Sequence, residues 1–266
     1  MSRYATMFER LGARGEAAFG GFLMLGDPDL ETSAKLLDSL VEGGADMVEV
    51  GIPFSDPVAD GPVIQAAAVR ALEAGTRVDD CFRLLAEFRS RHADVPVGIL
   101  TYANLVAARG RERFFADVAA AGVDSLLIAD VPSIEAQPYA DAARKAGVDL
   151  VMIAAPNTPG QTLTRIARLC SGYTYCVARA GVTGERQELA LDHDQLFSTL
   201  RSIGAPPAVL GFGISTPEHV RRAVASGAAG VISGSAIVRL GVEQGAGAVR
   251  RFVAEMKEAT RPTFSA

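Results

Sequence analysis

The sequence predicts an α/β fold, a single (β/α)8 barrel of the TIM type, and three observations support this prediction. The chain has 266 residues, a length close to that of typical barrels of this kind. Eight short apolar runs alternate with amphipathic segments along the whole chain. Gly122, Gly147 and Gly172 stand 25 residues apart, which fits a regular strand-plus-helix repeat. A doubly wound open sheet is the alternative.

The eight apolar runs are the predicted strands. Each run is short and apolar on both faces, as is typical of parallel strands that helices cover. A glycine follows several of the helical segments, where a left-handed backbone conformation can close the last turn before the next strand begins. In chain order the predicted strands are Gly20–Leu25, Met47–Val50, Val97–Tyr102, Ser125–Ala129, Leu150–Ile153, Thr174–Val177, Ala208–Gly211 and Gly230–Ile232.

Amphipathic patterns between these runs predict the helices. Apolar stripes at helical spacing lie within Leu36–Val41, Phe114–Ala119 and Leu163–Cys170. Thr216 and Pro217 have the pattern of an N-cap followed by the first helical residue. No linker, low-complexity tract or charge run divides the chain. We therefore expect one barrel domain over residues 1–266, with a short helical extension over about residues 1–15.

Composition argues against several classes of function. The formal net charge is −5, with 26 basic and 31 acidic residues, which disfavours a nucleic-acid-binding surface. No apolar stretch is long enough to predict a membrane span, and the N-terminal residues lack an apolar signal core. The cysteines, Cys81, Cys170 and Cys176, have no C-x-x-C spacing and are odd in number. This pattern predicts a reduced, cytoplasmic location.

The segment from Glu49 to Pro62 carries the most chemical information. Glu49 ends an apolar, strand-like run, and the proline-containing loop that follows carries Asp56 and Asp60. Burying an unpaired carboxylate is costly, so Glu49 makes physical sense if it faces a cavity and moves protons there. Asp60 is a second candidate for such chemistry. Alternatively, Asp60 only caps the helix expected to begin near Val63.

Glycine-rich loops follow the last three predicted strands, at Gly181–Gly184, Gly211–Ser215 and Ser233–Ile237. Loops with few side chains let backbone N–H groups approach an anion, and a helix that begins at Ser235 would direct its positive end toward it. Barrel enzymes often bind phosphate with the loops after strands seven and eight. The alternative is that these glycines only permit tight turns.

Other residue types narrow the chemistry further. All three lysines fall within helical patterns, whereas a Schiff-base aldolase needs a lysine at a strand end. The three histidines neither end a strand nor pair at metal-ligand spacing. No glycine-rich dinucleotide-binding loop follows the first strand. We therefore expect no metal or cofactor in this chain, and acid–base catalysis by carboxylates on a small phosphorylated substrate.

The segment EVGIPFSDPVADGP at Glu49–Pro62 resembles the signature of the tryptophan synthase alpha subunit family. The resemblance covers nearly the whole chain, with the motifs in the family's order. The further motifs are Leu25–Pro28, Tyr102–Leu105, Arg179–Gly184, Gly211–Ser215 and Ser233–Val238. The resemblance implies a lyase of tryptophan biosynthesis that cleaves indole-3-glycerol phosphate to indole and glyceraldehyde 3-phosphate. That retro-aldol reaction uses no cofactor of the alpha subunit.

The resemblance also implies roles for individual residues. Glu49 would protonate the indole ring at C3 and help to move the glycerol hydroxyl proton. Asp60 would accept or stabilise the indole N–H proton. Tyr175 would contact the site from the sixth strand, unless it is only a core residue of the barrel. The implied indole pocket is Phe22, Leu100, Leu127, Ile153 and Phe212, and the implied phosphate site is Gly184, Gly213, Gly234 and Ser235.

By the same resemblance, Arg179 and Thr183 belong to a loop that closes over the substrate; the alternative is a surface connection without a gating role. Family members pair with a beta subunit that carries pyridoxal phosphate and consumes the indole, in an alpha2beta2 heterotetramer. Pro53–Asp60 would then also be a contact surface. Two other functions stay open: a stand-alone indole-releasing lyase, and a non-catalytic barrel that binds a phosphorylated ligand and regulates a partner.

Overall fold

Eight parallel strands close into a barrel in the computed structural model of the protein, which describes residues 2–177 and 193–261. The strands follow one another around the barrel in chain order, and the last pairs with the first. This closure confirms the predicted (β/α)8 barrel and excludes an open sheet. The strands are β1 (Ala18–Met24), β2 (Met47–Gly51), β3 (Val97–Thr101), β4 (Ser125–Ile128), β5 (Asp149–Ala154), β6 (Thr174–Cys176), β7 (Ala208–Leu210) and β8 (Gly230–Ser233).

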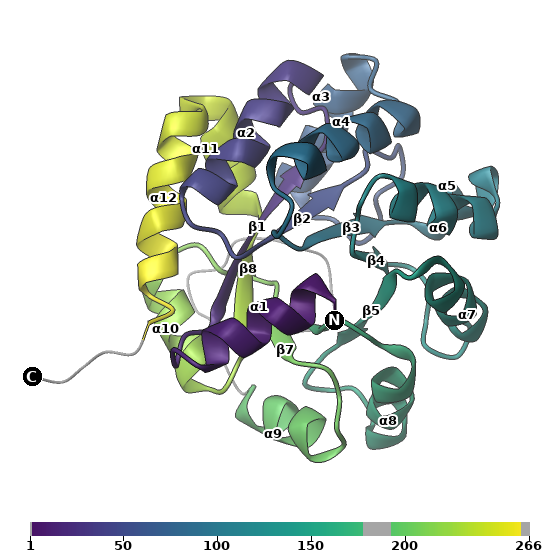
Figure 1. Ribbon diagram of the computed structural model, residues 1–266, viewed down its shortest axis with the longest axis vertical. Helices are drawn as coiled ribbons and strands as arrows, with labels where there is room; N and C mark the ends of the chain where they lie inside the picture. Colours follow the sequence, from purple (N-terminus) through teal and green to yellow (C-terminus); the bar gives the residue numbers. More distant parts are fainter. Residues whose placement is uncertain (1, 178–192, 262–266) are drawn as a thin grey trace, which may run out of the picture.

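Helices surround the barrel (Figure 1). Within the described residues, two helices rather than one follow each of β2, β3 and β8. The helices are α1 (Arg3–Gly12), α2 (Leu30–Glu42), α3 (Pro62–Glu73), α4 (Val78–Arg91), α5 (Ala103–Arg109), α6 (Arg111–Ala120), α7 (Gln137–Ala146), α8 (Gly160–Leu169), α9 (Asp194–Ser202), α10 (Pro217–Ala225), α11 (Ser235–Gln244) and α12 (Ala246–Glu258).

The strands are apolar on both faces because each face packs in a different part of the core. Every residue of β1 and of β2 is buried. Side chains such as Val48 and Leu126 pack in the layer between the barrel and the helices. Side chains such as Met47 and Ile232 fill the barrel interior. A carboxyl group on an inward-facing strand position is therefore surrounded by hydrocarbon, which strongly affects its ionisation.

Helix α1 closes the N-terminal end of the barrel interior. In Figure 1 it lies across the end of the barrel that faces the viewer. Its buried residues Tyr4, Met7 and Leu11 belong to the same apolar cluster as the interior strand residues. The Tyr4 hydroxyl is hydrogen-bonded to the Ser125 hydroxyl at 2.9 Å. Because this end is filled, a ligand can reach the interior side chains only from the opposite end, where the strands have their carboxyl termini.

The local signals for helix ends are confirmed. Thr216 is the N-cap of α10, where its hydroxyl accepts a hydrogen bond from the backbone N–H of His219, and Pro217 is the first helical residue. Gly147 ends α7 with φ of 72° and ψ of 27°, a left-handed conformation that costs glycine little because it lacks a Cβ.

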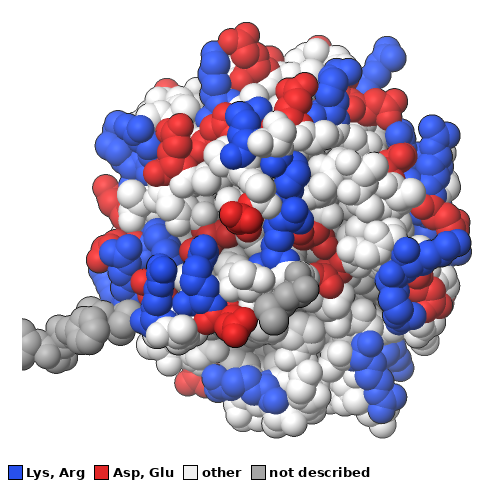
Figure 2. Space-filling model, viewed as in Figure 1, with Lys and Arg blue, Asp and Glu red and all other residues white. Residues whose placement is uncertain are grey.

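Acidic and basic side chains lie intermixed on the face of the molecule drawn in Figure 2, which is the face that α1 covers. Ion pairs also occur among the described residues: Arg89 contacts Asp124 at 2.8 Å, and the buried Lys257 contacts Asp46 at 2.8 Å. None of the helices in the described residues has the length and apolar character required to cross a membrane.

Candidate active site

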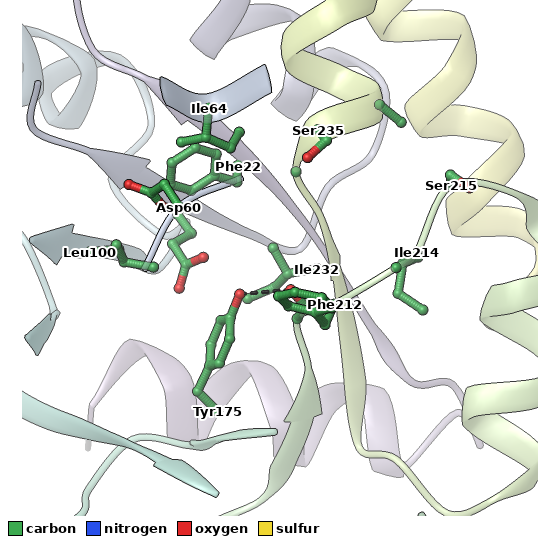
Figure 3. A pocket seen from close by; sticks show the side chains of 15 residues that line it. Phe22, Asp60, Ile64, Leu100, Tyr175, Phe212, Ile214, Ser215, Ile232 and Ser235 are labelled. Carbon is green, nitrogen blue, oxygen red and sulfur yellow. Dashed lines mark hydrogen bonds between the residues drawn. The ribbon is translucent and has the colours of Figure 1, made fainter. Parts of the chain in front are cut away.

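A cavity that is partly open to solvent lies at the carboxyl end of the barrel strands. Its apolar side chains Phe22, Ile64 and Leu100 lie near Asp60, and Ser215 and Ser235 lie at the other end (Figure 3). The full lining is Phe22, Glu49, Asp60, Ile64, Leu100, Tyr175, Gly211, Phe212, Gly213, Ile214, Ser215, Ile232, Gly234, Ser235 and Ala236.

This cavity brings together most of the site residues expected from the sequence. Those that line it are Glu49, Asp60, Tyr175, Phe22, Leu100, Phe212, Gly213, Gly234 and Ser235. Leu127 and Ile153 do not line it: Leu127 is buried and Ile153 half-buried in the apolar cluster of the barrel interior. Leu127 sits opposite Leu100 in the β3–β4 register. Arg179, Thr183 and Gly184 lie outside the described residues.

Glu49 projects from β2 into this apolar interior with 1% of its surface exposed. Its Oε1 accepts a hydrogen bond of 3.0 Å from the Tyr173 hydroxyl. Its Oε2 has no hydrogen-bond partner among the described residues. Burial raises the pKa of Glu49 to about 8; the hydrogen bond from Tyr173 lowers it, and the nearby Asp60 charge raises it. At neutral pH Glu49 is therefore mainly a neutral acid that can donate a proton.

Asp60 lies in the loop after β2 and is 6% exposed. Its Oδ2 accepts a hydrogen bond of 2.8 Å from the Tyr102 hydroxyl. Burial raises the pKa of Asp60 above its ordinary value, and this hydrogen bond opposes the increase. The idea that Asp60 merely caps the following helix is wrong, because the N-cap of α3 is Gly61 and no side chain makes a capping hydrogen bond there.

Tyr175 reaches the cavity from β6, and its hydroxyl donates a hydrogen bond of 2.8 Å to the Gly211 carbonyl oxygen (Figure 3). The contact requires glycine at position 211, since a Cβ there would lie 2.0 Å from Tyr175 Cζ. Burial raises the pKa of Tyr175 well above its ordinary value, and the charges of Glu49 and Asp60 add to this effect. The phenol is therefore neutral at physiological pH.

The other end of the cavity has the features of an anion site. Gly234 is the N-cap of α11, which begins at Ser235, and no side chain caps this helix end. A Cβ on Gly234 would meet no protein atom closer than 3.7 Å, which is ordinary van der Waals contact with Phe22, so a methyl group would cause no clash there. The Ser233 hydroxyl donates a hydrogen bond of 2.6 Å to the Ile214 carbonyl oxygen, which joins the end of β8 to the loop after β7. Free backbone N–H groups at such a helix end favour a phosphate.

The sequence patterns did not identify Tyr173 and Tyr102 as site residues. Tyr173 lies two residues before Tyr175, so both project to the same side of the strand, and this periodicity could have identified it. Tyr102 directly follows β3. Tyr102 could have been identified by its position, because active-site residues of such barrels lie at the carboxyl ends of the strands.

Comparisons with known proteins agree with this geometry. The family model for the tryptophan synthase alpha chain matches residues 8–264. The tryptophan synthase alpha chain of Aeromonas salmonicida is 54% identical over 240 residues, 90% of each chain. That of Aeromonas hydrophila is 50% identical over 266 residues, 98% of this chain and 99% of the relative.

Solved structures extend the likeness to the fold. A structure of Mycobacterium tuberculosis tryptophan synthase contains a chain that is similar at a TM-score of 0.90 and 31% identity, over 98% of this chain and 99% of that one. The tryptophan synthase alpha subunit of Legionella pneumophila matches with a TM-score of 0.87 and 30% identity, over 98% of each chain. A family model that spans nearly the whole sequence, together with relatives of this similarity, shows that the chain belongs to the tryptophan synthase alpha chain family.

Proposed function

We propose that the protein is the alpha subunit of a tryptophan synthase and cleaves indole-3-glycerol phosphate to indole and glyceraldehyde 3-phosphate. One observation carries the proposal: two buried carboxyl groups, Glu49 and Asp60, face one apolar cavity whose other end is lined by glycines and a helix N-terminus. The apolar walls suit the indole ring of this substrate, the two carboxyl groups can donate and accept its protons, and the helix N-terminus suits its phosphate group.

Glu49 is the proposed general acid. Cleavage of the carbon–carbon bond requires a proton at C3 of the indole ring, so that the ring becomes a leaving group. A carboxyl group with a pKa of about 8 still holds its proton at neutral pH and can deliver it. After donation, Glu49 is a carboxylate that can take the glycerol hydroxyl proton as the aldehyde forms. Each correctly positioned acid or base typically contributes about 10²–10⁴-fold in rate.

Asp60 is the proposed acceptor for the indole N–H. Positive charge develops on the ring nitrogen when C3 is protonated, and a carboxylate within hydrogen-bond reach stabilises it. The phenol of Tyr102 favours the ionised form of Asp60. Tyr175 would contact the substrate with its ring, since its hydroxyl hydrogen is engaged by Gly211.

The remaining residues bind the two ends of the substrate. Phe22, Leu100 and Phe212 would surround the indole ring, with Leu127 and Ile153 supporting the pocket from the barrel interior. Gly213, Gly234 and Ser235 would hold the phosphate through backbone N–H groups. Arg179, Thr183 and Gly184 are proposed to complete the site from the loop after β6. The chain itself would need no cofactor.

A beta subunit that carries pyridoxal phosphate is the proposed partner, in an alpha2beta2 assembly within the cytoplasm. Family membership supports this, and so does the exposed Val58, 69% of whose surface is accessible on the proline-rich loop after β2. Two alternatives have less support. A stand-alone lyase lacks an observation that favours it over the paired enzyme. A non-catalytic binding barrel would not need two buried carboxyl groups in the cavity, which cost stability unless they have a chemical role.

The experiment that tests the proposal follows both products. Purified protein is incubated with indole-3-glycerol phosphate, and indole and glyceraldehyde 3-phosphate are each quantified over time. We expect the two products in equal amounts. Indole without glyceraldehyde 3-phosphate, or neither product even with a beta subunit present, would refute the retro-aldol assignment.

A further inference from the structure

Tyr102 makes three contacts with the loop that carries Asp60. Its hydroxyl donates a hydrogen bond of 2.8 Å to Asp60 Oδ2 and accepts one of 3.2 Å from the backbone N–H of Ala59. Its ring is stacked on that of Phe54, with centroids 5.3 Å apart and planes at 30°. Tyr102 itself is 2% exposed. One side chain thus contacts the beginning and the end of the segment Phe54–Asp60.

The backbone of Tyr102 is itself fixed on both sides. It follows β3 directly and forms the N-cap of α5, where its carbonyl oxygen accepts a hydrogen bond of 3.1 Å from the Leu105 N–H. The next residue, Ala103, donates its N–H to Asp130 Oδ1 at 2.8 Å. The phenol is therefore presented from a fixed strand end, whereas Asp60 lies on a loop.

The Tyr102 hydroxyl is always protonated and therefore acts as a hydrogen-bond donor to Asp60. Burial and the neighbouring Asp60 charge hold the pKa of Tyr102 far above its ordinary value, so the phenol always carries its proton. The protonated hydroxyl donates to Asp60, and an ionised carboxylate accepts such a hydrogen bond better than a neutral carboxylic acid does. Donation from Tyr102 favours ionised Asp60 and opposes the effect of burial, which favours the neutral acid.

We propose that Tyr102 is the positioning residue of Asp60: it orders the loop Phe54–Asp60 and keeps the Asp60 carboxyl group ionised and aimed into the cavity. The inference rests on the proposed function, since it takes Asp60 as the acceptor for the indole N–H. It adds a residue that acts through Asp60 and need not touch the substrate.

The test is the substitution Tyr102→Phe, which keeps the ring on Phe54 and removes only the hydroxyl. The acidic limb of the kcat/KM profile reports ionisation of Asp60 in the free enzyme. Loss of a hydrogen bond to a charged group should move this limb upward by about one pH unit. The alkaline limb, which Glu49 controls, should stay within about 0.3 of a pH unit, because the hydrogen bond to Glu49 comes from Tyr173 and not from Tyr102.

Two controls make the result specific. Tyr139→Phe removes the hydroxyl of a half-buried tyrosine on α7 that does not line the cavity; it should leave both limbs in place. Because wild type and both variants act on the same substrate, ionisation of the substrate phosphate cancels in the comparison. Amide exchange gives a second readout: the Ala59 N–H should exchange about tenfold faster in Tyr102→Phe and unchanged in Tyr139→Phe.

The outcomes separate this proposal from the function on which it rests. Asp60→Asn is assayed beside Tyr102→Phe. If Asp60→Asn is inactive and the acidic limb of Tyr102→Phe coincides with that of the wild type, the positioning role of Tyr102 is refuted while the role of Asp60 stands. If Tyr102→Phe loses activity equally at every pH and the Ala59 N–H exchanges at the wild-type rate, the hydroxyl neither orders the loop nor acts on the ionisation of Asp60, and the proposal is also refuted. If Asp60→Asn keeps wild-type turnover, Asp60 is not the acceptor, and the proposed function fails at that residue.

Discussion

The Tyr173 hydroxyl donates a hydrogen bond of 3.0 Å to Glu49 Oε1 inside the barrel, although the two residues are 124 positions apart in the chain. The contact fixes the orientation of a carboxyl group whose other oxygen has no hydrogen-bond partner among the described residues. Such an oxygen favours the neutral acid, because ionisation would place an unsolvated charge in hydrocarbon. The local geometry thus holds a proton at neutral pH where the proposed reaction uses one.

The first prediction concerns the pH dependence of cleavage. Glu49 must be protonated to act as the acid, and its pKa is about 8. We therefore expect kcat/KM to fall as the pH rises through about 8, in a profile measured from pH 5 to 10. An alkaline limb is the signature, whereas a rate that is flat up to pH 9.5 would contradict the assignment. Tyr173→Phe removes a donor that favours ionised Glu49, so this variant should shift the limb to higher pH.

The second prediction concerns stability. The pKa of Glu49 is raised from 4.5 in its ordinary state to about 8 in the folded protein. As the pH rises from about 4.5 to 8, the unfolded chain releases this proton while the folded protein retains it, so the folded state loses stability across that window. Glu49→Gln cannot ionise. Its Tm should therefore exceed that of the wild type by at least about 2 °C at pH 8.

The control for this effect is the same comparison at acidic pH. At about pH 3.5, below the ordinary pKa of 4.5, wild-type Glu49 is largely neutral in both the folded and the unfolded state, so the difference in Tm should shrink toward zero. Calorimetric scans at both pH values would make the comparison. An equal difference at the two pH values would show that packing, rather than ionisation, separates the two proteins.

The third prediction tests the phosphate end of the cavity. A methyl group on Gly234 would meet no protein atom closer than 3.7 Å, so Gly234→Ala should fold with nearly the wild-type Tm. If phosphate occupies that space, Gly234→Ala should raise KM, and Gly234→Asp should raise it by more than about tenfold because it adds a like charge. Stabilisation by glycerol phosphate in thermal shift assays should weaken in parallel.

Gly12→Ala is a control that, like Gly234→Ala, causes no clash, since a Cβ at Gly12 meets no atom within 4 Å, and the residue lies at the opposite end of the barrel. It should leave KM and the glycerol phosphate response unchanged. Undiminished stabilisation of Gly234→Asp by glycerol phosphate would mean that the anion binds elsewhere. Gly213 is a less informative position, because its φ of 72° strains any side chain irrespective of the ligand.

The fourth prediction concerns the partner. Asp60 lies on a loop, so a beta subunit that packs on Pro53–Asp60 can raise turnover without adding a catalytic group. The gain should correspond to a coupling free energy of about 1–3 kcal/mol. A titration of the beta subunit at fixed substrate measures it. Val58→Ser, at the exposed apolar side chain of this loop, should weaken the activation, whereas Val69→Ser on α3, 52% exposed, should not. A flat titration would favour the stand-alone lyase.

Sequence patterns predicted the barrel because its determinants are local and repeated. All eight strands occur within two residues of the predicted bounds, and α11 begins at Ser235 as expected. Hydrophobic runs, helix caps and closing glycines such as Gly147 act within one repeat, so a single sequence displays them. Glu49 could be singled out for a related reason, since a carboxylate among valines contradicts the strand around it.

Local sequence patterns could not predict the hydrogen bonds that shift the pKa values of Glu49 and Asp60. Tyr102 follows β3 and Tyr173 precedes β6, so their distances from Asp60 and Glu49 depend on barrel closure and strand register. The same dependence explains why Leu127 and Ile153 do not line the cavity: their depth in the barrel follows from the register of β4 and β5, which no local pattern encodes. The alternative role of Asp60 as a helix cap is wrong because the N-cap of α3 is Gly61; the Asp60 carboxylate accepts its hydrogen bond from Tyr102 instead.

The most direct test of acid–base cleavage by Glu49 and Asp60 is the turnover of Glu49→Gln and Asp60→Asn. Indole release from saturating indole-3-glycerol phosphate is measured with excess beta subunit, and circular dichroism verifies that both variants are folded. Each substitution keeps the shape of the side chain and removes its ability to exchange a proton. We predict that turnover falls by at least about 10²-fold in each variant. Retention of more than about a tenth of wild-type turnover by a folded Glu49→Gln would contradict the account.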